Sequence, residues 1–172
     1  MIFLLREKNH IISTIVEHKP GVLYTVANLF RCRGFNIESI SVGPTEQSDL
    51  ARMTITVEGD ERTVEQVVKQ LNKLIDVIKV SRLDPASIVT RELALIKVRA
   101  LNTKSRSDAI NYADIFRARV VDVSSESLTM EITGTSDKID AFLDLMKPFG
   151  VKEVARTGIT ALSRGVKSIK IE

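Results

Sequence analysis

The chain has few of the side chains from which catalytic and metal sites are usually built. Among its 172 residues there are one cysteine, two histidines and no tryptophan. A single cysteine, Cys32, excludes an internal disulfide, and with His10 and His18 alone it cannot complete a zinc site. The sequence also contains no nucleophile elbow and no glycine-rich phosphate-binding motif. We therefore expect no catalytic residue, no metal and no cofactor of its own.

Long hydrophobic runs are absent as well. No segment approaches the ~20 apolar residues that a transmembrane helix needs. The opening MIFLLREKN turns charged after five apolar residues, and it lacks the basic segment and cleavage site of a secretory signal. We expect a cytoplasmic protein that does not bind a membrane.

Charge of one sign is not in large excess. The formal net charge is +3, and the charged residues, 27% of the chain, are interspersed. A nucleic-acid binder gathers its basic residues on one face. The pattern instead indicates a solvated surface of mixed charge.

The first half of the chain contains clear strand and helix patterns. Alternating, β-branched segments predict four strands, at 10–18, 35–44, 51–59 and 76–83. Apolar residues at helical spacing predict helices at 21–34 and 61–74. The order is βαββαβ, and strict alternation over 35–44 places Ile37 on the same face as Ser39 and Ser41.

The same order recurs in the second half. Strands are predicted at 91–100, 118–124, 127–134 and 151–158, with helices at 105–117 and 137–150. In an alignment of the halves, Phe30 matches Phe116 and Arg31 matches Arg117. We predict an α+β protein of two ferredoxin-like domains, each an antiparallel sheet with two helices on one face. The predicted boundaries are 1–83 with a short extension at 1–9, a linker at 84–90, and 91–172.

The helix-free face of the first sheet raises two questions. A bare apolar face favours association, and pairing of two copies is the simplest way to cover it, so we expect an oligomer. RNA-recognition domains share the βαββαβ order and stack bases on aromatic residues of the two central strands. The segments IISTIVE and ARMTITVE contain no aromatic residue, which argues against a nucleic-acid partner.

The segment VEHKPGVL, residues 16–23, joins the first strand to the first helix. The N–H groups at the start of a helix are free to bind an anion, and Gly21 lets a ligand approach the backbone closely. Pro20 presets the entry into the helix. From these residues alone, a seat for a carboxylate and a simple tight turn both remain open.

Several longer motifs carry a family resemblance. The segments RGFNIES and ARMTI, followed by RELALIKV, TGTSDKIDAF, EVARTG and ALSRG, resemble the regulatory (small) subunit of acetohydroxyacid synthase, also called acetolactate synthase. The first unit resembles an ACT domain, and the likeness extends from His10 to about Gly165.

The resemblance implies a regulatory role in branched-chain amino-acid biosynthesis. Such a subunit binds and activates a catalytic large subunit, to which thiamine diphosphate, Mg²⁺ and FAD belong. It mediates feedback inhibition by valine, or by leucine or isoleucine, bound between the ACT domains of a homodimer. The implied effector-binding residues are His18, Lys19, Pro20, Gly21, Val22 and Leu23 of one protomer with Asn36 and Ile37 of the other.

The resemblance also implies roles for these residues. Backbone N–H groups from Gly21 to Leu23 would hold the ligand carboxylate, Asn36 would bond its polar groups, and Val22 with Ile37 would form an apolar wall. Members of the family usually have Asn or Asp where this chain has His18, a larger side chain that can become cationic. The alternative is a stand-alone amino-acid-sensing ACT protein that regulates another enzyme or transcription.

Overall fold

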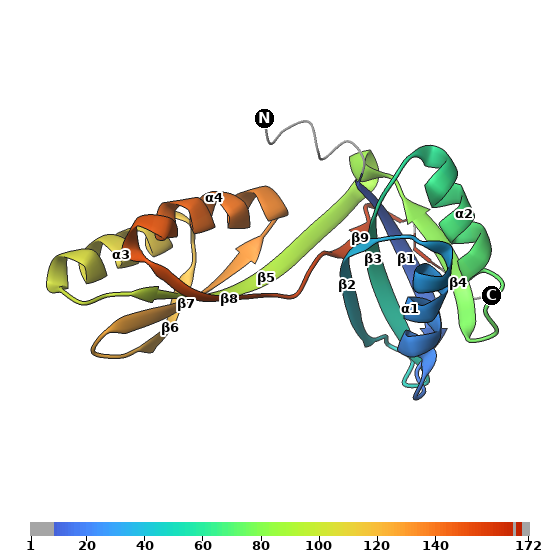
Figure 1. Cartoon of the computed structure of the whole chain (residues 1–172), viewed down its shortest axis with the longest axis horizontal. Helices are drawn as coiled ribbons and strands as arrows, with labels where there is room; N and C mark the ends of the chain where they lie inside the picture. The colour runs from blue at the N-terminus through green and yellow to red at the C-terminus, as the bar shows by residue number, and fades with distance from the viewer. Residues whose placement is uncertain (1–8, 167, 170–172) are drawn as a thin grey trace. The chain divides into compact units, whose positions relative to one another are not determined.

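The computed structural model describes residues 9–166, 168 and 169. The predicted N-terminal extension therefore lies outside the described residues, except for Asn9. The described chain forms two compact units (Figure 1). The first unit contains residues 9–89 and the described residues from Ile159 onward, and the second contains Thr90–Gly158.

The first unit has the predicted order of strands and helices. Its elements are β1 (Asn9–Glu17), α1 (Val22–Arg33), β2 (Ile37–Pro44), β3 (Leu50–Glu58), α2 (Glu61–Leu71) and β4 (Val77–Leu83). The strands form an antiparallel sheet in the order β2-β3-β1-β4. This is the ferredoxin-like arrangement, and it confirms the predicted fold class of this half.

Both helices cover one face of this sheet (Figure 1). Val26 and Phe30 of α1 and Val67 of α2 are buried against alternate residues of β1 and β3. The helical spacing that predicted α1 and α2 therefore marks the residues of the core.

One detail of β2 differs from the predicted alternation. The pairing of β2 with β3 shifts register between Ile37 and Ser39, as a β-bulge does. Ile37 and Ile40 consequently both pack against the helix-side core. Ser39 donates instead to Thr56 on the other face, over 3.1 Å. The prediction that Ile37 shares a face with Ser39 is therefore wrong.

The second unit repeats the first. Its elements are β5 (Ile88–Arg99), α3 (Thr103–Ile115), β6 (Arg119–Val123), β7 (Ser127–Gly134), α4 (Ser136–Met146) and β8 (Val151–Arg156). The strand order is β6-β7-β5-β8, equivalent to that of the first unit. α4 is shorter than predicted because a 3-10 turn, Lys147–Phe149, follows it at Pro148.

Residues from three of the family motifs meet at one end of α4. The Glu92 carboxylate, almost fully buried, accepts hydrogen bonds from the Ser136 hydroxyl and from Nε and Nη2 of Arg156. Arg156 also donates to Asp140 over 2.7 Å. This network joins β5, β8 and α4. Residues of the motifs RELALIKV, EVARTG and TGTSDKIDAF therefore hold these three elements in place by bonding to one another.

The segment after β8 returns to the first unit. It contains β9 (Thr160–Ser163), which pairs with β5. The Arg164 N–H donates to the Ser87 carbonyl over 2.8 Å, and Arg164 Nε donates to the Ile88 carbonyl over 2.9 Å. The described residues from Ile159 onward therefore pack with the first unit, whereas the sequence predicts that 91–172 form the second domain. β5 also begins inside the predicted linker, at Ile88, after a 3-10 turn at Pro85–Ser87.

This returning segment covers part of the helix-free face of the first sheet. Ala161 is buried in a small core with Ile11, Leu83 and Ile88. Thr160 bonds Ser41 over 2.9 Å, and the Ile159 N–H donates to Ser39 over 3.5 Å. This bare face is the reason for the expected pairing of two copies. Because the chain itself covers part of the face, pairing through it stays a prediction.

Candidate functional site

The loop between β1 and α1 is short and is held at both sides by backbone hydrogen bonds. β1 ends at Glu17 and α1 begins at Val22. The Glu17 N–H donates to the Asp76 carbonyl over 2.9 Å, and the His18 N–H donates to the Asp49 carbonyl over 2.7 Å. Loops from two other parts of the unit therefore fix where α1 starts.

Gly21 gives this helix an open N-terminus. It is the N-cap residue with φ 91° and ψ −18°, a left-handed conformation, and no side chain caps the helix. The first bond of the helix runs from the Thr25 N–H to the Gly21 carbonyl, over 2.9 Å. The preceding N–H groups of Val22, Leu23 and Tyr24 thus lack an acceptor within the helix. A Cβ at Gly21 would meet no atom within 4 Å, so a small anion can reach these groups.

Lys19 is held by two carboxylates of its own unit. Its ammonium group pairs with Asp76 at 2.7 Å and also with Glu17. These hydrogen bonds, the one to Asp76 having the larger effect, raise the pKa of Lys19 well above its usual value. A lysine with a raised pKa is charged at neutral pH and loses its partners only when the pH rises through that pKa. Lys19 therefore anchors the loop and does not offer a free charge to a ligand.

The predicted apolar residues differ in their exposure. Val22 is only 3% exposed and belongs to the core under the helices, and Ile37 packs against the same core. Leu23, by contrast, is 48% exposed. The prediction that Val22 forms the wall of a ligand site is therefore corrected: its side chain stabilises the domain, and Leu23 is the apolar group that the loop presents.

The remaining predicted polar residues lie on the surface. His18 and Pro20 are exposed. Asn36, at the start of β2, is also exposed, and its amide donates to the Glu38 carboxylate. Among the described residues, Asn36 makes no hydrogen bond to the loop of its own chain. The structure of one chain therefore brings the loop residues together and leaves Asn36 apart.

Sequence reasoning missed three neighbours of the loop. Asp76 and Glu17 fix Lys19, and Tyr24 is 73% exposed in the first turn of α1. Asp76 could not be found from local pattern, because it belongs to the connection before β4, far along the chain. Tyr24 could have been found from the helical pattern. It follows Val22 by two positions, so it lies off the apolar stripe of α1 and is expected on the exposed side of the helix.

The described residues form neither a metal-binding cluster nor a membrane-spanning helix. No group of three or more His, Cys, Asp or Glu side chains in this part of the chain is placed to hold a metal ion. No helix among the same residues is both long and apolar enough to cross a membrane.

Comparison with known families matches both units. Residues 12–79 match the small-subunit-like ACT domain of acetohydroxyacid synthase (AHAS), and residues 91–165 match the family described as the small subunit of acetolactate synthase. The two matches meet near the boundary between the units.

Individual relatives are similar over almost their whole length. A protein of Methanothermobacter thermautotrophicus, named "Probable acetolactate synthase small subunit", is 60% identical over 93% of this chain and 95% of its own. The acetolactate synthase small subunit of Mycolicibacterium smegmatis is 51% identical over 93% and 94%. The crystal structure of the Thermotoga maritima small subunit has a TM-score of 0.85 at 46% identity, covering 91% of this chain and 98% of its own. With this identity and coverage, and with an ACT domain that carries the open loop at Gly21, the chain belongs to the family of acetolactate synthase small subunits.

Proposed function

We propose that this small subunit is regulatory: it binds and activates the catalytic large subunit and makes that enzyme sensitive to valine. Thiamine diphosphate, Mg²⁺ and FAD belong to the catalytic partner in this proposal. The observation that supports it is the uncapped N-terminus of α1 behind Gly21. An amino-acid carboxylate fits N–H groups that have no other acceptor, and the helix dipole adds to the attraction.

The effector would bind between the ACT domains of a homodimer. Its carboxylate would accept from the N–H groups of Val22 and Leu23, which follow Gly21 at the start of α1, and its alkyl group would contact the exposed Leu23 side chain. Asn36 of the second protomer would turn from Glu38 to bond the ligand's ammonium or carboxylate group. Residues 1–83 would thus be the effector-binding and dimerisation domain, acting in the cytoplasm.

Feedback inhibition requires a difference between two states of the dimer. A ligand that binds both states equally shifts nothing. Coupling between sites is typically ~1–3 kcal/mol, which is a change of about 5- to 150-fold. Leucine and isoleucine differ from valine by one methylene, worth about 1–3 kcal/mol in an apolar pocket. Such a pocket does not separate the three amino acids sharply, so we propose valine as the effector with leucine or isoleucine as the alternatives.

The test is reconstitution of acetolactate formation from the chain and a catalytic subunit, with and without valine. Gly21→Asp places a carboxylate where that of the ligand would sit, and it should abolish valine inhibition while leaving the complex intact. Because Gly21 is left-handed, any side chain there adds strain. Gly21→Ala carries this strain without the charge and is the matched control. If Gly21→Asp is still fully inhibited by valine, the effector site is elsewhere.

His18 allows a further test of the proposal. The imidazole is exposed beside the loop and is larger than the Asn side chain usual in the family at this position. His18→Asn should therefore change valine affinity, measured by calorimetry, by a few-fold. Equal affinity of His18→Asn and the wild type would exclude a role for His18.

A further inference from the structure

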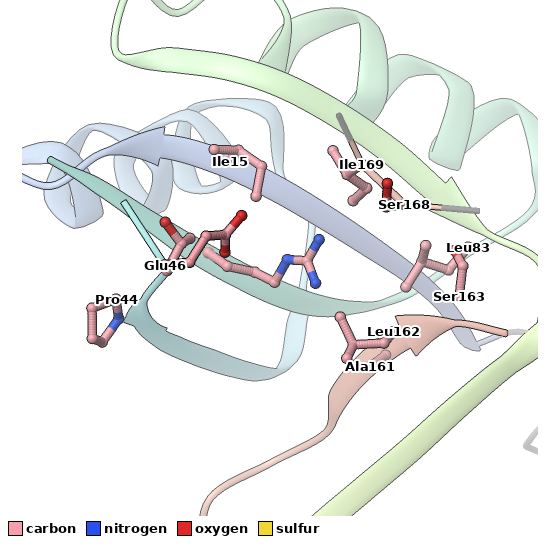
Figure 2. Close-up of a pocket in the computed structure, with 11 residues that line it drawn as sticks. Ile15, Pro44, Glu46, Leu83, Ala161, Leu162, Ser163, Ser168 and Ile169 are labelled. Carbon is pink, nitrogen blue, oxygen red and sulfur yellow. The ribbon is translucent and has the colours of Figure 1, made fainter. Parts of the chain in front are cut away.

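A cavity lies on the helix-free face of the first sheet, away from the loop at Gly21. Its volume is about 450 Å³, within the ~300–1,000 Å³ range of small-molecule sites. Figure 2 shows the side chains around it, which come from β1, β3, β4 and β9, from the end of β2 and the connection that follows it, and from Ser168 and Ile169. The returning segment forms one side, so the cavity exists only because residues after Gly158 pack on this unit.

A positively charged side chain forms part of the cavity wall. Arg52 projects from the central strand β3, opposite Ile15 of β1 and Gly43 of β2. Its Nε is buried and has no hydrogen-bond partner among the described residues. A buried donor without an acceptor costs free energy, so this group is suited to bind an incoming anion. Arginine binds a carboxylate through two parallel hydrogen bonds.

The space next to Arg52 is open because its neighbour in β2 is a glycine. A Cβ at Gly43 would meet no atom within 4 Å. Cross-strand partners point to the same face of a sheet, so a larger residue at Gly43 would project beside Arg52. This glycine has no positive φ and lies within a strand, which means that the backbone conformation does not require it.

The other side chains of the cavity supply the groups that would bind the rest of an amino acid. Glu46 lines the cavity and supplies a negative charge, while Ile15, Leu83 and Leu162 supply apolar surface (Figure 2). We propose that this cavity is a second binding site, specific for an aliphatic α-amino acid in its zwitterionic form. The carboxylate binds Arg52, the ammonium group binds Glu46, and the alkyl group contacts the three apolar side chains. A simple carboxylate is less suitable, because Glu46 would repel it without a compensating positive charge.

The cavity site lies within one protomer, whereas the proposed effector site is shared between two. Valine serves as the probe for both, so the inference rests in part on the proposed function. Equilibrium dialysis of the full chain with radiolabelled L-valine measures the number bound per chain. The wild type should bind in two classes of site. Arg52→Gln should weaken the cavity class at least tenfold, and Gly21→Asp should remove only the other class.

A second variant of the cavity and a control guard against loss of folding. Gly43→Leu keeps the Arg52 guanidinium but places a side chain beside it, in the space that the ligand would occupy, and should remove the same class of site. Arg62→Gln changes an exposed arginine of α2; it is the matched control and should not change valine binding.

Glu46→Gln tests how the ammonium group is bound. It should weaken the binding of valine but not of 2-oxoisovalerate, which has the same skeleton without the ammonium group.

The outcomes separate the two proposals. If Arg52→Gln and Gly43→Leu both bind as much valine as the wild type, the cavity is not an amino-acid site. If Gly21→Asp alone leaves binding and inhibition unchanged, the effector site at the loop is wrong and the cavity site stands. If Arg52→Gln weakens valine and 2-oxoisovalerate equally and Glu46→Gln weakens neither, the cavity takes carboxylates in general and the zwitterion assignment is overturned.

Discussion

The two units of this chain share one topology but differ where their first helices begin. α1 starts at a left-handed glycine without a side-chain cap, whereas α3 starts at Asn102, whose side chain accepts from the Ser105 N–H over 2.8 Å. Ser105 also interacts with the Asn102 backbone, which completes a capping box. The second unit satisfies its helix terminus internally, and the first leaves that terminus open. Duplication of the fold has therefore not duplicated the open helix N-terminus.

The helix-free faces of the two sheets also differ, and again it is the first unit that has polar groups without a partner in the described part of the chain. The face of the first unit is covered in part by the returning segment, which leaves a cavity around Arg52. The corresponding face of the second unit exposes Leu95 and Ala155 beside charged residues such as Lys97 and Glu153. The first face therefore has a buried arginine nitrogen without a hydrogen-bond partner among the described residues, whereas Lys97 and Glu153 on the second face pair with each other.

The largest expected effect comes from the Glu92–Arg156 ion pair of the second unit, whose carboxylate is buried and whose guanidinium is partly exposed. Arg156→Met leaves the Glu92 carboxylate buried without its cation, and such a loss typically costs about 3–5 kcal/mol. Chemical denaturation should show it, and adding Glu92→Met should recover much of the stability. Arg82 is the matched control: its pair with Glu61 is exposed in the first unit, so Arg82→Met should leave stability unchanged within error. Equal effects of the two single variants would contradict this contrast.

The covered face of the first unit is tested by the same substitution at two alanines, one buried in the first unit and one exposed in the second. Ala161 is 1% exposed in β9, so Ala161→Asp buries a charge and should destabilise the first unit by about 2–4 kcal/mol. Hydrogen exchange should rise in β1 and β4. Ala155 is exposed on the face of the second unit, and Ala155→Asp should stay within about 0.5 kcal/mol of the wild type. Unchanged exchange in Ala161→Asp would mean that β9 does not stabilise that face.

The capping difference predicts a moderate effect. Asn102→Ala removes the N-cap of α3 and should cost about 1 kcal/mol, measured by thermal unfolding. It should leave valine inhibition intact, because the open helix terminus is in the other unit. Loss of inhibition in Asn102→Ala would show that the second unit takes part in effector binding.

The smallest effect concerns the ends of the same two helices. α1 is followed by Gly34 at φ 69°, and α3 by Arg117 at φ 54°. A left-handed arginine is strained, so Arg117→Gly should stabilise the second unit by at most about 1 kcal/mol. The reciprocal change, Gly34→Arg, should destabilise the first by a similar amount. If Arg117→Gly is destabilising, the arginine side chain makes contacts that outweigh its backbone strain.

Local pattern was sufficient for most of the fold. The alternation of β-branched residues located the eight strands of the two repeats, and apolar spacing located α1, α2 and α4, because each element buries one face against its own sheet. The polar helix α3 was placed by the repeated order of elements. The bulge in β2 could not be foreseen, since it arises from how Ile37 pairs with β3. The position of the candidate loop followed from Pro20 and Gly21, but the burial of Val22 and the anchoring of Lys19 by Asp76 depend on residues distant in sequence.

The order of amino acids alone established the duplicated α+β plan, the family motifs and a glycine at the start of α1. These features are encoded locally, in the period of apolar residues and in the backbone freedom of single positions. Only the folded chain revealed that residues after Gly158 cross back to the first unit, that Glu92 and Arg156 pair, and that Arg52 lies beside a cavity. Such contacts join segments that no short sequence window contains, so they emerge only when packing brings those segments together.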